Sequence, residues 1–446
     1  MRALAVALLV AACGGAAPKP QLLGAPLPAR CETEPTRCFA AVRDRQLAAQ
    51  LVLEDDGRLR AYVQRVVDRV AAVSTLPRAP RIVIEATGST AYVIRGGRLA
   101  ISRALLVRLA NEAELAGVIA HELAHLEGAH AELAEARLPR ADWLASRRDA
   151  EAIADERAVE LLARAGYPPV ALATLYERRQ REHPEDATDD EHPRIDQSVP
   201  RLRRLAAGRE RGFVGRQPLL DGVAGTIVGH DTRLGTRVGD TWVVARLGVA
   251  LPVTGTIDEV PAEHRMREVD QRTEVYVVSA AYGDELASGL AERRVRTMPI
   301  GVVTTGIMPR RPRRETPLGR ALDAWRDQVL GPDAGTQVAL VRRSGGTLVI
   351  ESPSEIEQLA VLHTLRAPTP AERTAAEPPR VVLVTAPRGG TVRELASLCP
   401  DATIAIELDD PTYRLAPGDR LKCTTKPVSA RDGGADRTPR TDGARG

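Results

Sequence analysis

The stretch His121-Glu122-Leu123-Ala124-His125 decides the fold and the chemistry that we predict from the sequence. Two histidines four residues apart lie one turn apart on a helix, so their imidazoles can bind one metal ion. Zinc accepts neutral imidazole ligands, and a neighbouring carboxylate that stays off the metal can take a proton from water that the metal activates. The motif therefore predicts zinc-dependent hydrolysis, with His121 and His125 as ligands and Glu122 as general base.

The residues before and around the motif predict a helix. Asn111 is a typical N-cap residue, and Glu114, three positions later, is expected to complete a capping box. Apolar residues then recur at helical spacing and give the helix a buried stripe: Leu115, Val118, Ile119, Leu123 and Leu126.

A catalytic zinc usually has a third protein ligand. In the metzincin pattern this would be a histidine at position 131, but the chain has Ala131 there, and His130 lies about 100° of helix out of register. Glu151 and Asp155 are better candidates, because they share one face of a second predicted helix that ends at Gly166. We expect Glu151 to bind zinc and Asp155 to orient a ligand histidine. His130 and Asp155 are the alternative third ligands, and a solvated acidic helix face is the other interpretation.

Several segments together carry a resemblance to a known family. They are residues 56–63, 90–101, 111–118, 151–155, 191–193 and 201–205. From Leu51 to Leu205 the chain resembles the HtpX-like and CAAX-prenyl-endopeptidase zinc metallopeptidases, peptidase family M48. It is most similar to the periplasmic lipoprotein branch, which includes the β-barrel assembly-enhancing protease.

The resemblance implies an α+β fold and particular site residues. The fold would be a mainly helical gluzincin domain with a small sheet near residues 81–101, followed by smaller β-containing domains. Glu151 would be the third zinc ligand. His192 would lie near the zinc, either steadying the transition state or plugging the metal. An edge strand around Val93 would pair with an extended substrate.

The N-terminus resembles a bacterial lipoprotein signal. A positive charge at Arg2 precedes a short apolar run and the sequence Val10-Ala11-Ala12-Cys13. We expect Cys13 to carry lipid and, because Gly14 is not Asp, to place the protein at the outer membrane facing the periplasm. The alternatives are an ordinary apolar N-terminus and signal cleavage without lipid.

Four further cysteines fall into two pairs that are close in sequence. Cys31 and Cys38 precede the predicted peptidase region, and Cys399 and Cys423 lie near the end of the chain. In an oxidising periplasm we expect each pair to form a disulfide.

The remaining organisation follows from composition and turn signals. With 446 residues and 43% hydrophobic content, the chain can build two or three domains, and its net charge of +3 predicts no nucleic-acid surface. The expected segments are a signal peptide (1–12), a tether (13–38), the peptidase domain (39–212), a β-rich region with a basic linker (213–317), a C-terminal α/β region (318–425) and a disordered tail (426–446). Within the α/β region, residues 381–425 weakly resemble a LysM-like module that contacts peptidoglycan.

These observations predict a zinc metalloendopeptidase that cleaves unfolded or misassembled cell-envelope proteins, a role in protein quality control. The alternative is a metal-binding envelope chaperone or scaffold with little proteolytic turnover.

Overall fold

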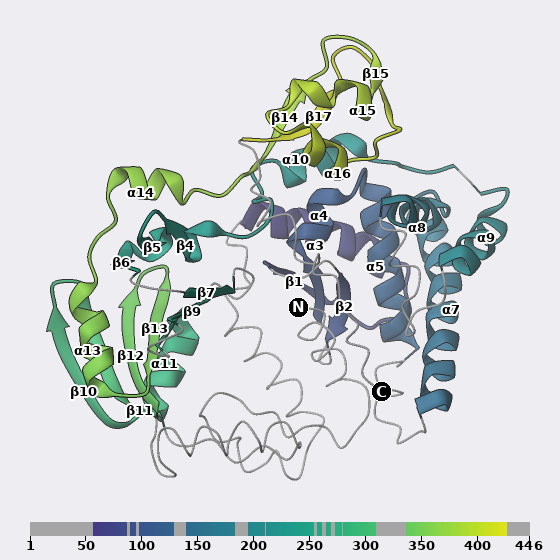
Figure 1. Ribbon diagram of the computed structural model, residues 1–446. Coiled ribbons are helices and arrows are strands. Elements are labelled where there is room, and N and C mark those ends of the chain that lie inside the picture. The colour runs from purple at the N-terminus through teal and green to yellow at the C-terminus, as the bar shows by residue number, and fades with distance from the viewer. Residues whose placement is uncertain are drawn as a thin grey trace, which may run out of the picture. The chain divides into compact units, whose positions relative to one another are not determined.

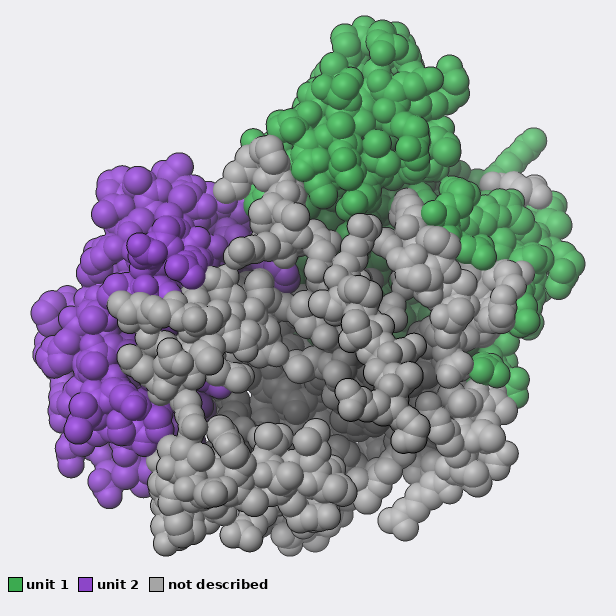
Figure 2. All heavy atoms as spheres, in the orientation of Figure 1, with its two compact units in different colours: residues 1–18, 54–229, 379–446 green, residues 19–53, 230–378 purple. Residues whose placement is uncertain are grey.

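The chain builds two compact units. The computed structural model describes residues 57–86, 90–94, 98–128, 140–182, 195–209, 211–253, 257–260, 265–268, 273–278, 280–308 and 336–425. Of these, residues up to 229 and from 379 onward form unit 1, and residues 230–378 form unit 2 (Figure 2). Unit 2 is therefore inserted into unit 1. The boundary expected at 212/213 falls inside unit 1, and the one expected at 317/318 lies outside the described residues.

Unit 1 contains the predicted peptidase elements, mainly helices with one small sheet (Figure 1). In chain order they are α3 (Gly57–Ala71), β1 (Arg81–Glu85), β2 (Ala91–Ile94), β3 (Arg98–Ser102), α4 (Arg103–Arg108), α5 (Glu112–Glu127), α7 (Arg140–Ala165), α8 (Ala171–Glu182), α9 (Ile195–Ala206) and α10 (Arg216–Val223). The strand order is β1-β3-β2, with β1 parallel and β2 antiparallel to β3. Helices and sheets segregate along the chain, so the α+β fold class is confirmed.

Helix α5 begins as the sequence predicts, but its capping box differs. The Asn111 side chain accepts a hydrogen bond from the Glu114 amide at 3.0 Å. The Glu114 carboxylate does not return to the Asn111 amide. It accepts instead from the Ala110 amide at 2.8 Å and from Arg178 of α8 at 2.7 Å. The reciprocal bond was predicted from local spacing, whereas the buried guanidinium that attracts this carboxylate comes from 64 residues away.

Helix α5 is buried on nearly all sides and packs closely against its neighbours. A Cβ atom on Gly117 would lie only 3.3 Å from the Cα atom of Leu172 in α8. On α7, Ala154 and Ala158 are fully buried, which lets this helix also approach α5. As predicted, α7 is followed by Gly166, whose φ of +78° favours glycine.

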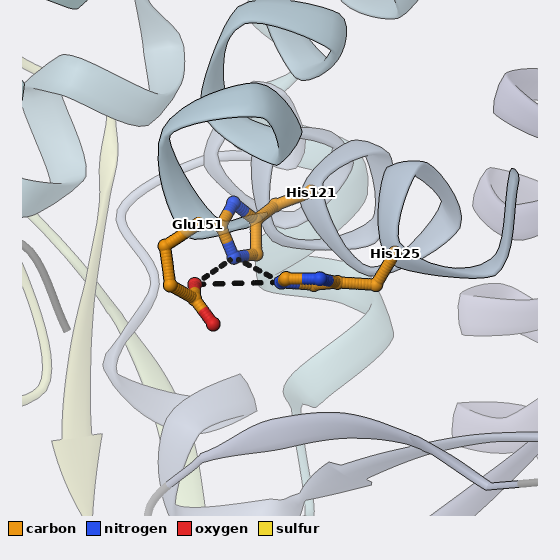
Figure 3. A group of neighbouring side chains, drawn as sticks. All are labelled: His121, His125 and Glu151. Carbon is orange, nitrogen blue, oxygen red and sulfur yellow. Dashed lines mark hydrogen bonds and ion pairs between the residues drawn. The ribbon is translucent and has the colours of Figure 1, made fainter. Parts of the chain in front are cut away.

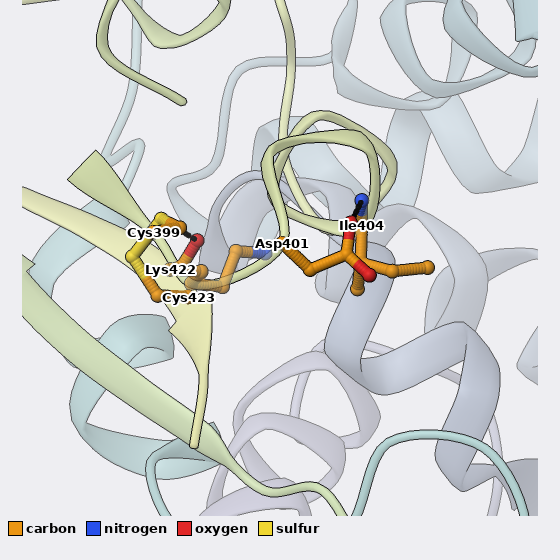
Figure 4. Close-up of a disulfide and its surroundings, with 5 residues drawn as sticks. All are labelled: Cys399, Asp401, Ile404, Lys422 and Cys423. Carbon is orange, nitrogen blue, oxygen red and sulfur yellow. Dashed lines mark hydrogen bonds between the residues drawn. A yellow bond between two sulfur atoms is a disulfide. The ribbon is translucent and has the colours of Figure 1, made fainter. Parts of the chain in front are cut away.

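The last described segment returns to unit 1 as a small strand–helix–strand arrangement. Its elements are β14 (Val381–Thr385), β15 (Gly390–Thr391), α15 (Val392–Leu395), η6 (Ala396–Leu398), α16 (Ala402–Glu407), β16 (Arg414–Leu415) and β17 (Arg420–Thr424). Strands β14 and β17 pair antiparallel. Cys399 and Cys423, the pair expected near the end of the chain, form a disulfide beside Lys422 (Figure 4). The likeness to a LysM module stays a prediction.

Buried cations hold this segment against the connection between α4 and α5. The Lys422 ammonium group donates to the carbonyl oxygens of Val107 at 2.9 Å and Leu109 at 2.6 Å, where α4 ends. Burial lowers the pKa of Lys422 to about 8. Arg216 of α10 donates twice to the fully buried carboxylate of Asp409, at 2.8 and 2.7 Å. Lys422 thus donates hydrogen bonds to carbonyl oxygens at the end of α4 that have no donor within the helix.

Unit 2 is built around β-sheets. Its elements are η3 (Thr232–Leu234), β4 (Thr236–Val238), β5 (Thr241–Val244), η4 (Ala245–Leu247), β6 (Val249–Pro252), β7 (Ile257–Val260), β8 (Arg265–Glu268), β9 (Glu274–Val278), α11 (Ala280–Gly289), β10 (Ala291–Met298), β11 (Gly301–Met308), β12 (Thr336–Arg343), β13 (Gly346–Ser352), α13 (Glu355–Thr364) and α14 (Pro370–Ala375). An antiparallel seven-stranded sheet has the order β10-β11-β12-β13-β9-β8-β7, and β4-β5-β6 form a separate sheet.

Two sequence predictions concern strands near or within unit 2. The Ser344-Gly345-Gly346 turn between two apolar runs predicts a β-hairpin, and the structure contains it as β12 and β13, closed by the pair Arg343 and Gly346. The run Thr226-Ile227-Val228 has the β-like pattern of a short strand, but in the structure it forms an isolated bridge, between Ile227 and Arg380. The Val228 amide also donates to the carbonyl oxygen of Pro379, and the Val381 amide donates to that of Thr226, both at 2.8 Å, so the pairing with residues 379–381 is real but short.

Several predicted features lie outside the described residues. They are Cys13, Cys31, Cys38, His130, His192, the basic stretch 309–314 and the tail 426–446. In the described part, no helix combines the length and the apolar character needed to cross a bilayer.

The docking of the C-terminal segment yields a stability prediction. Lys422→Met should lower the free energy of unfolding by about 1–3 kcal/mol, because two buried carbonyls lose their donor. Arg420→Met on the same strand removes a partly exposed ion pair with Asp221 and an exposed hydrogen bond to Gln217, and it should cost at most about 1 kcal/mol. Thermal unfolding of both variants under oxidising conditions measures the difference, and equal midpoints would contradict the buried cap.

Candidate metal centre

Three side chains from two helices converge at one point. His121 and His125 project from α5, and Glu151 reaches them from α7 (Figure 3). The Nε2 atoms of the two histidines are 3.1 Å apart. The Glu151 Oε2 atom lies 3.1 Å from Nε2 of His121 and 3.4 Å from Nε2 of His125. The structure thus brings together the ligand set that the sequence predicts.

The spacing of these three atoms fits a metal ion. Atoms bound at 2.0–2.1 Å to a tetrahedral zinc lie about 3.3–3.4 Å from one another, which matches the observed separations. Neutral imidazole nitrogens and a carboxylate oxygen all present lone pairs, and such atoms repel one another unless a cation or a proton lies between them. Across the described ranges, no second group of three or more His, Cys, Asp or Glu side chains converges in this way.

Asp155 stands behind His121, one turn of α7 beyond Glu151. Its Oδ1 atom is 3.1 Å from Nδ1 of His121, a short contact whose direction is poor for a hydrogen bond. Its Oδ2 atom accepts from Arg201 of α9 at 2.7 Å. Asp155 therefore lies against Nδ1 of His121, which is compatible with the orienting role that the sequence predicts. With Nδ1 turned to this carboxylate, Nε2 of His121 faces the other two ligand atoms.

The sequence analysis assigns no role at the metal centre to two residues that contact Asp155. Arg201 lies in a segment that resembles the family, but its spacing gave no reason to link it to Asp155. Tyr176 of α8 donates its hydroxyl to Oδ1 of Asp155 at 3.3 Å. The sequence gives little indication that Tyr176 contacts the site, because a single tyrosine on an amphipathic helix usually belongs to the core.

The charges of the centre hold a proton on His121 when no metal is bound. Burial disfavours the charged imidazole, but the close contacts with Asp155 and Glu151 and their negative charges outweigh it and raise the pKa of His121 well above 6.5. Burial likewise opposes ionisation of Glu151, yet its contacts with His121 and His125 lower the pKa of this carboxyl below its usual value. A cation is thus favoured at this place.

Glu122 lies next to His121 on α5 and is 8% exposed. One residue along a helix turns the side-chain direction by about 100°, so Glu122 does not share the face of the two histidines. Burial raises the pKa of Tyr176, and the negative charges of Asp155, Glu151 and Glu122 raise it further. All three carboxylates therefore act electrostatically on Tyr176.

The raised pKa of His121 makes metal binding a proton-releasing step. The charged imidazole stabilises the metal-free protein below its unfolded-state pKa, and this contribution is lost as the pH rises through the folded-state value. A metal must displace that proton, so affinity for Zn²⁺ should rise with pH by up to about tenfold per unit. Calorimetric titration near pH 7 in two buffers of different ionisation enthalpy should show release of about one proton. An equal heat of zinc binding in both buffers would contradict a protonated His121 in the metal-free protein.

The comparisons with known proteins agree with this geometry. The model of Peptidase family M48 matches residues 58–139, which run from α3 through the whole of α5. Glu151 lies beyond the end of the match. No curated protein shows significant similarity to the chain. Residues 58–139, which contain His121, Glu122 and His125, therefore match peptidase family M48, a family of metallopeptidases.

Proposed function

We propose that the protein is a zinc-dependent metalloendopeptidase. The observation that carries this proposal is the convergence of Nε2 of His121, Nε2 of His125 and Oε2 of Glu151 within 3.1–3.4 Å. Two imidazoles and one carboxylate are the ligand set of gluzincin peptidases, and they leave a tetrahedral position for water or substrate.

The chain's own residues divide the work of hydrolysis. Zinc, when bound, supplies a Lewis acid that activates water and polarises the scissile carbonyl. Glu122 accepts the proton from the attacking water and then delivers it to the leaving amine. Asp155, held by Arg201, keeps Nδ1 of His121 engaged, so that Nε2 stays available as a ligand.

The sheet of unit 1 supports binding of an extended peptide. Strand β2 has one neighbouring strand, β3, in the described part of the sheet, so its other edge can pair with substrate backbone. Main-chain pairing recognises few side chains, which suits a peptidase that acts on unfolded chains. We propose unfolded or misassembled cell-envelope proteins as the substrate class.

The cellular setting rests on the sequence. The Val10-Ala11-Ala12-Cys13 run supports a lipid anchor at the outer membrane, facing the periplasm. The likeness of residues 381–425 to a LysM module supports a contact with peptidoglycan. An envelope chaperone or scaffold with little turnover is the competing function.

The role of Glu122 gives the most direct test of enzymatic function. Glu122→Gln should lower the rate of cleavage of an unfolded protein such as reduced casein by about 10²–10⁴-fold, because the proton acceptor is lost, while zinc content is unchanged. Glu156→Gln, an exposed change on α7, serves as the control and should cleave like the wild type. If the zinc-loaded wild type bound the substrate without cutting it, the chaperone or scaffold would be favoured.

The role of Glu151 has a separate readout. Glu151→Gln should weaken zinc binding by at least about tenfold, because a charged ligand is replaced by a neutral amide. Elemental analysis after dialysis against a weak chelator measures the retained zinc, again with Glu156→Gln beside it. Full zinc occupancy in the Glu151 variant would transfer the third-ligand role to Asp155 or His130.

A further inference from the structure

Tyr176 touches the metal centre from a helix that supplies none of its ligands. It lies on α8, and its hydroxyl donates to Oδ1 of Asp155 at 3.3 Å. The same oxygen is 3.1 Å from Nδ1 of His121. A chain of contacts therefore leads from Tyr176 through one carboxylate oxygen to a ligand histidine.

The two oxygens of Asp155 are held in different ways. Oδ2 accepts a charged donor, Arg201 of α9, at 2.7 Å. Oδ1, the atom that faces His121, has the Tyr176 hydroxyl as its other partner. A carboxylate fixed at Oδ2 alone can still rotate about that contact, whereas a donor at Oδ1 fixes the plane of the group.

We propose that Tyr176 is a positioning residue of the metal centre, which acts through Asp155 to fix the ring of His121. The proposal rests on the zinc function above and deepens it. Tyr176 contacts Asp155, the carboxylate that lies against His121. Its effect is to fix the orientation of the carboxylate that holds Nδ1 of His121, and thereby the direction of the Nε2 lone pair.

The backbone around Tyr176 is well suited to this task. The next residue, Glu177, pairs with Arg203 of α9 at 2.5 Å, and Arg178 makes the buried ion pair with Glu114 of α5. Three consecutive side chains of α8 thus contact α7, α9 and α5. This anchoring on both sides limits how far the Tyr176 hydroxyl can move away from Asp155.

The hydroxyl also remains a donor over any working pH. Burial first, and then the negative charges of Asp155, Glu151 and Glu122, raise the pKa of Tyr176 well above 10. A neutral tyrosine facing a carboxylate can only donate its proton to it.

The competing explanation is that Tyr176 is an ordinary buried tyrosine whose hydroxyl needs an acceptor. The chain contains a matched example of that case. Tyr167 donates its hydroxyl to the buried carboxylate of Glu112 at 2.7 Å, at the start of α5 and away from the ligand atoms. A purely structural role for Tyr176 predicts that the two Tyr→Phe changes behave alike.

The experiment compares Tyr176→Phe with Tyr167→Phe in the full-length protein. Competition with a chelator of known affinity gives the dissociation constant for Zn²⁺, and thermal unfolding of the metal-free proteins gives their stability. Tyr176→Phe should weaken zinc binding by about 2–10-fold, and Tyr167→Phe should leave the dissociation constant unchanged although it lowers the unfolding midpoint. Equal zinc affinity in Tyr176→Phe and wild type, or an equal loss in both variants, would overturn the proposal.

A double-mutant cycle tests the route through Asp155. If Tyr176 acts on His121 only through this carboxylate, adding Tyr176→Phe to Asp155→Asn should cause no further loss of zinc affinity. Full additivity of the two changes would overturn the proposed route. A wild-type protein that fails to bind zinc would instead refute the zinc function on which this inference rests.

Discussion

The close packing of α5 against α7 is the constraint on which the candidate site depends. Each helix brings one part of the ligand set, and neither part can bind a metal in the proposed way alone. Buried alanines at positions 154 and 158 of α7 permit the approach, and Arg157 of α7 pairs with Glu127 at the end of α5 at 2.6 Å. With the helices at this distance, Glu151 reaches both histidines; even a small separation would take its carboxylate out of range.

Parts of the chain that are remote in sequence fix the position of α5. Arg178 neutralises Glu114 in the first turn, and Lys422 and Arg216 donate to carbonyl oxygens of the connection that leads into the helix. The inserted unit 2 separates residues 229 and 379, yet the chain on both sides of it belongs to unit 1. Unit 1 is therefore complete only when residues 379–425 have packed against its earlier part.

Local spacing explains what the sequence could predict. The pattern from His121 to His125, the N-cap at Asn111 and the pair Glu151 and Asp155 follow from helical periodicity, which is visible in a few neighbouring residues. Contacts of Tyr176 with Asp155, of Arg178 with Glu114 and of Lys422 with α4 join residues that are far apart in sequence. No spacing rule connects such residues, so these contacts and the return of the chain to unit 1 become visible only in the folded protein.

Anomalous diffraction at the zinc edge, from crystals of the zinc-loaded protein, tests the central claim most directly. The account predicts one peak about 2.0–2.2 Å from Nε2 of His121, Nε2 of His125 and a carboxylate oxygen of Glu151, with Glu122 outside bonding distance. A peak bound to other side chains, or no peak beside these two histidines, would contradict it.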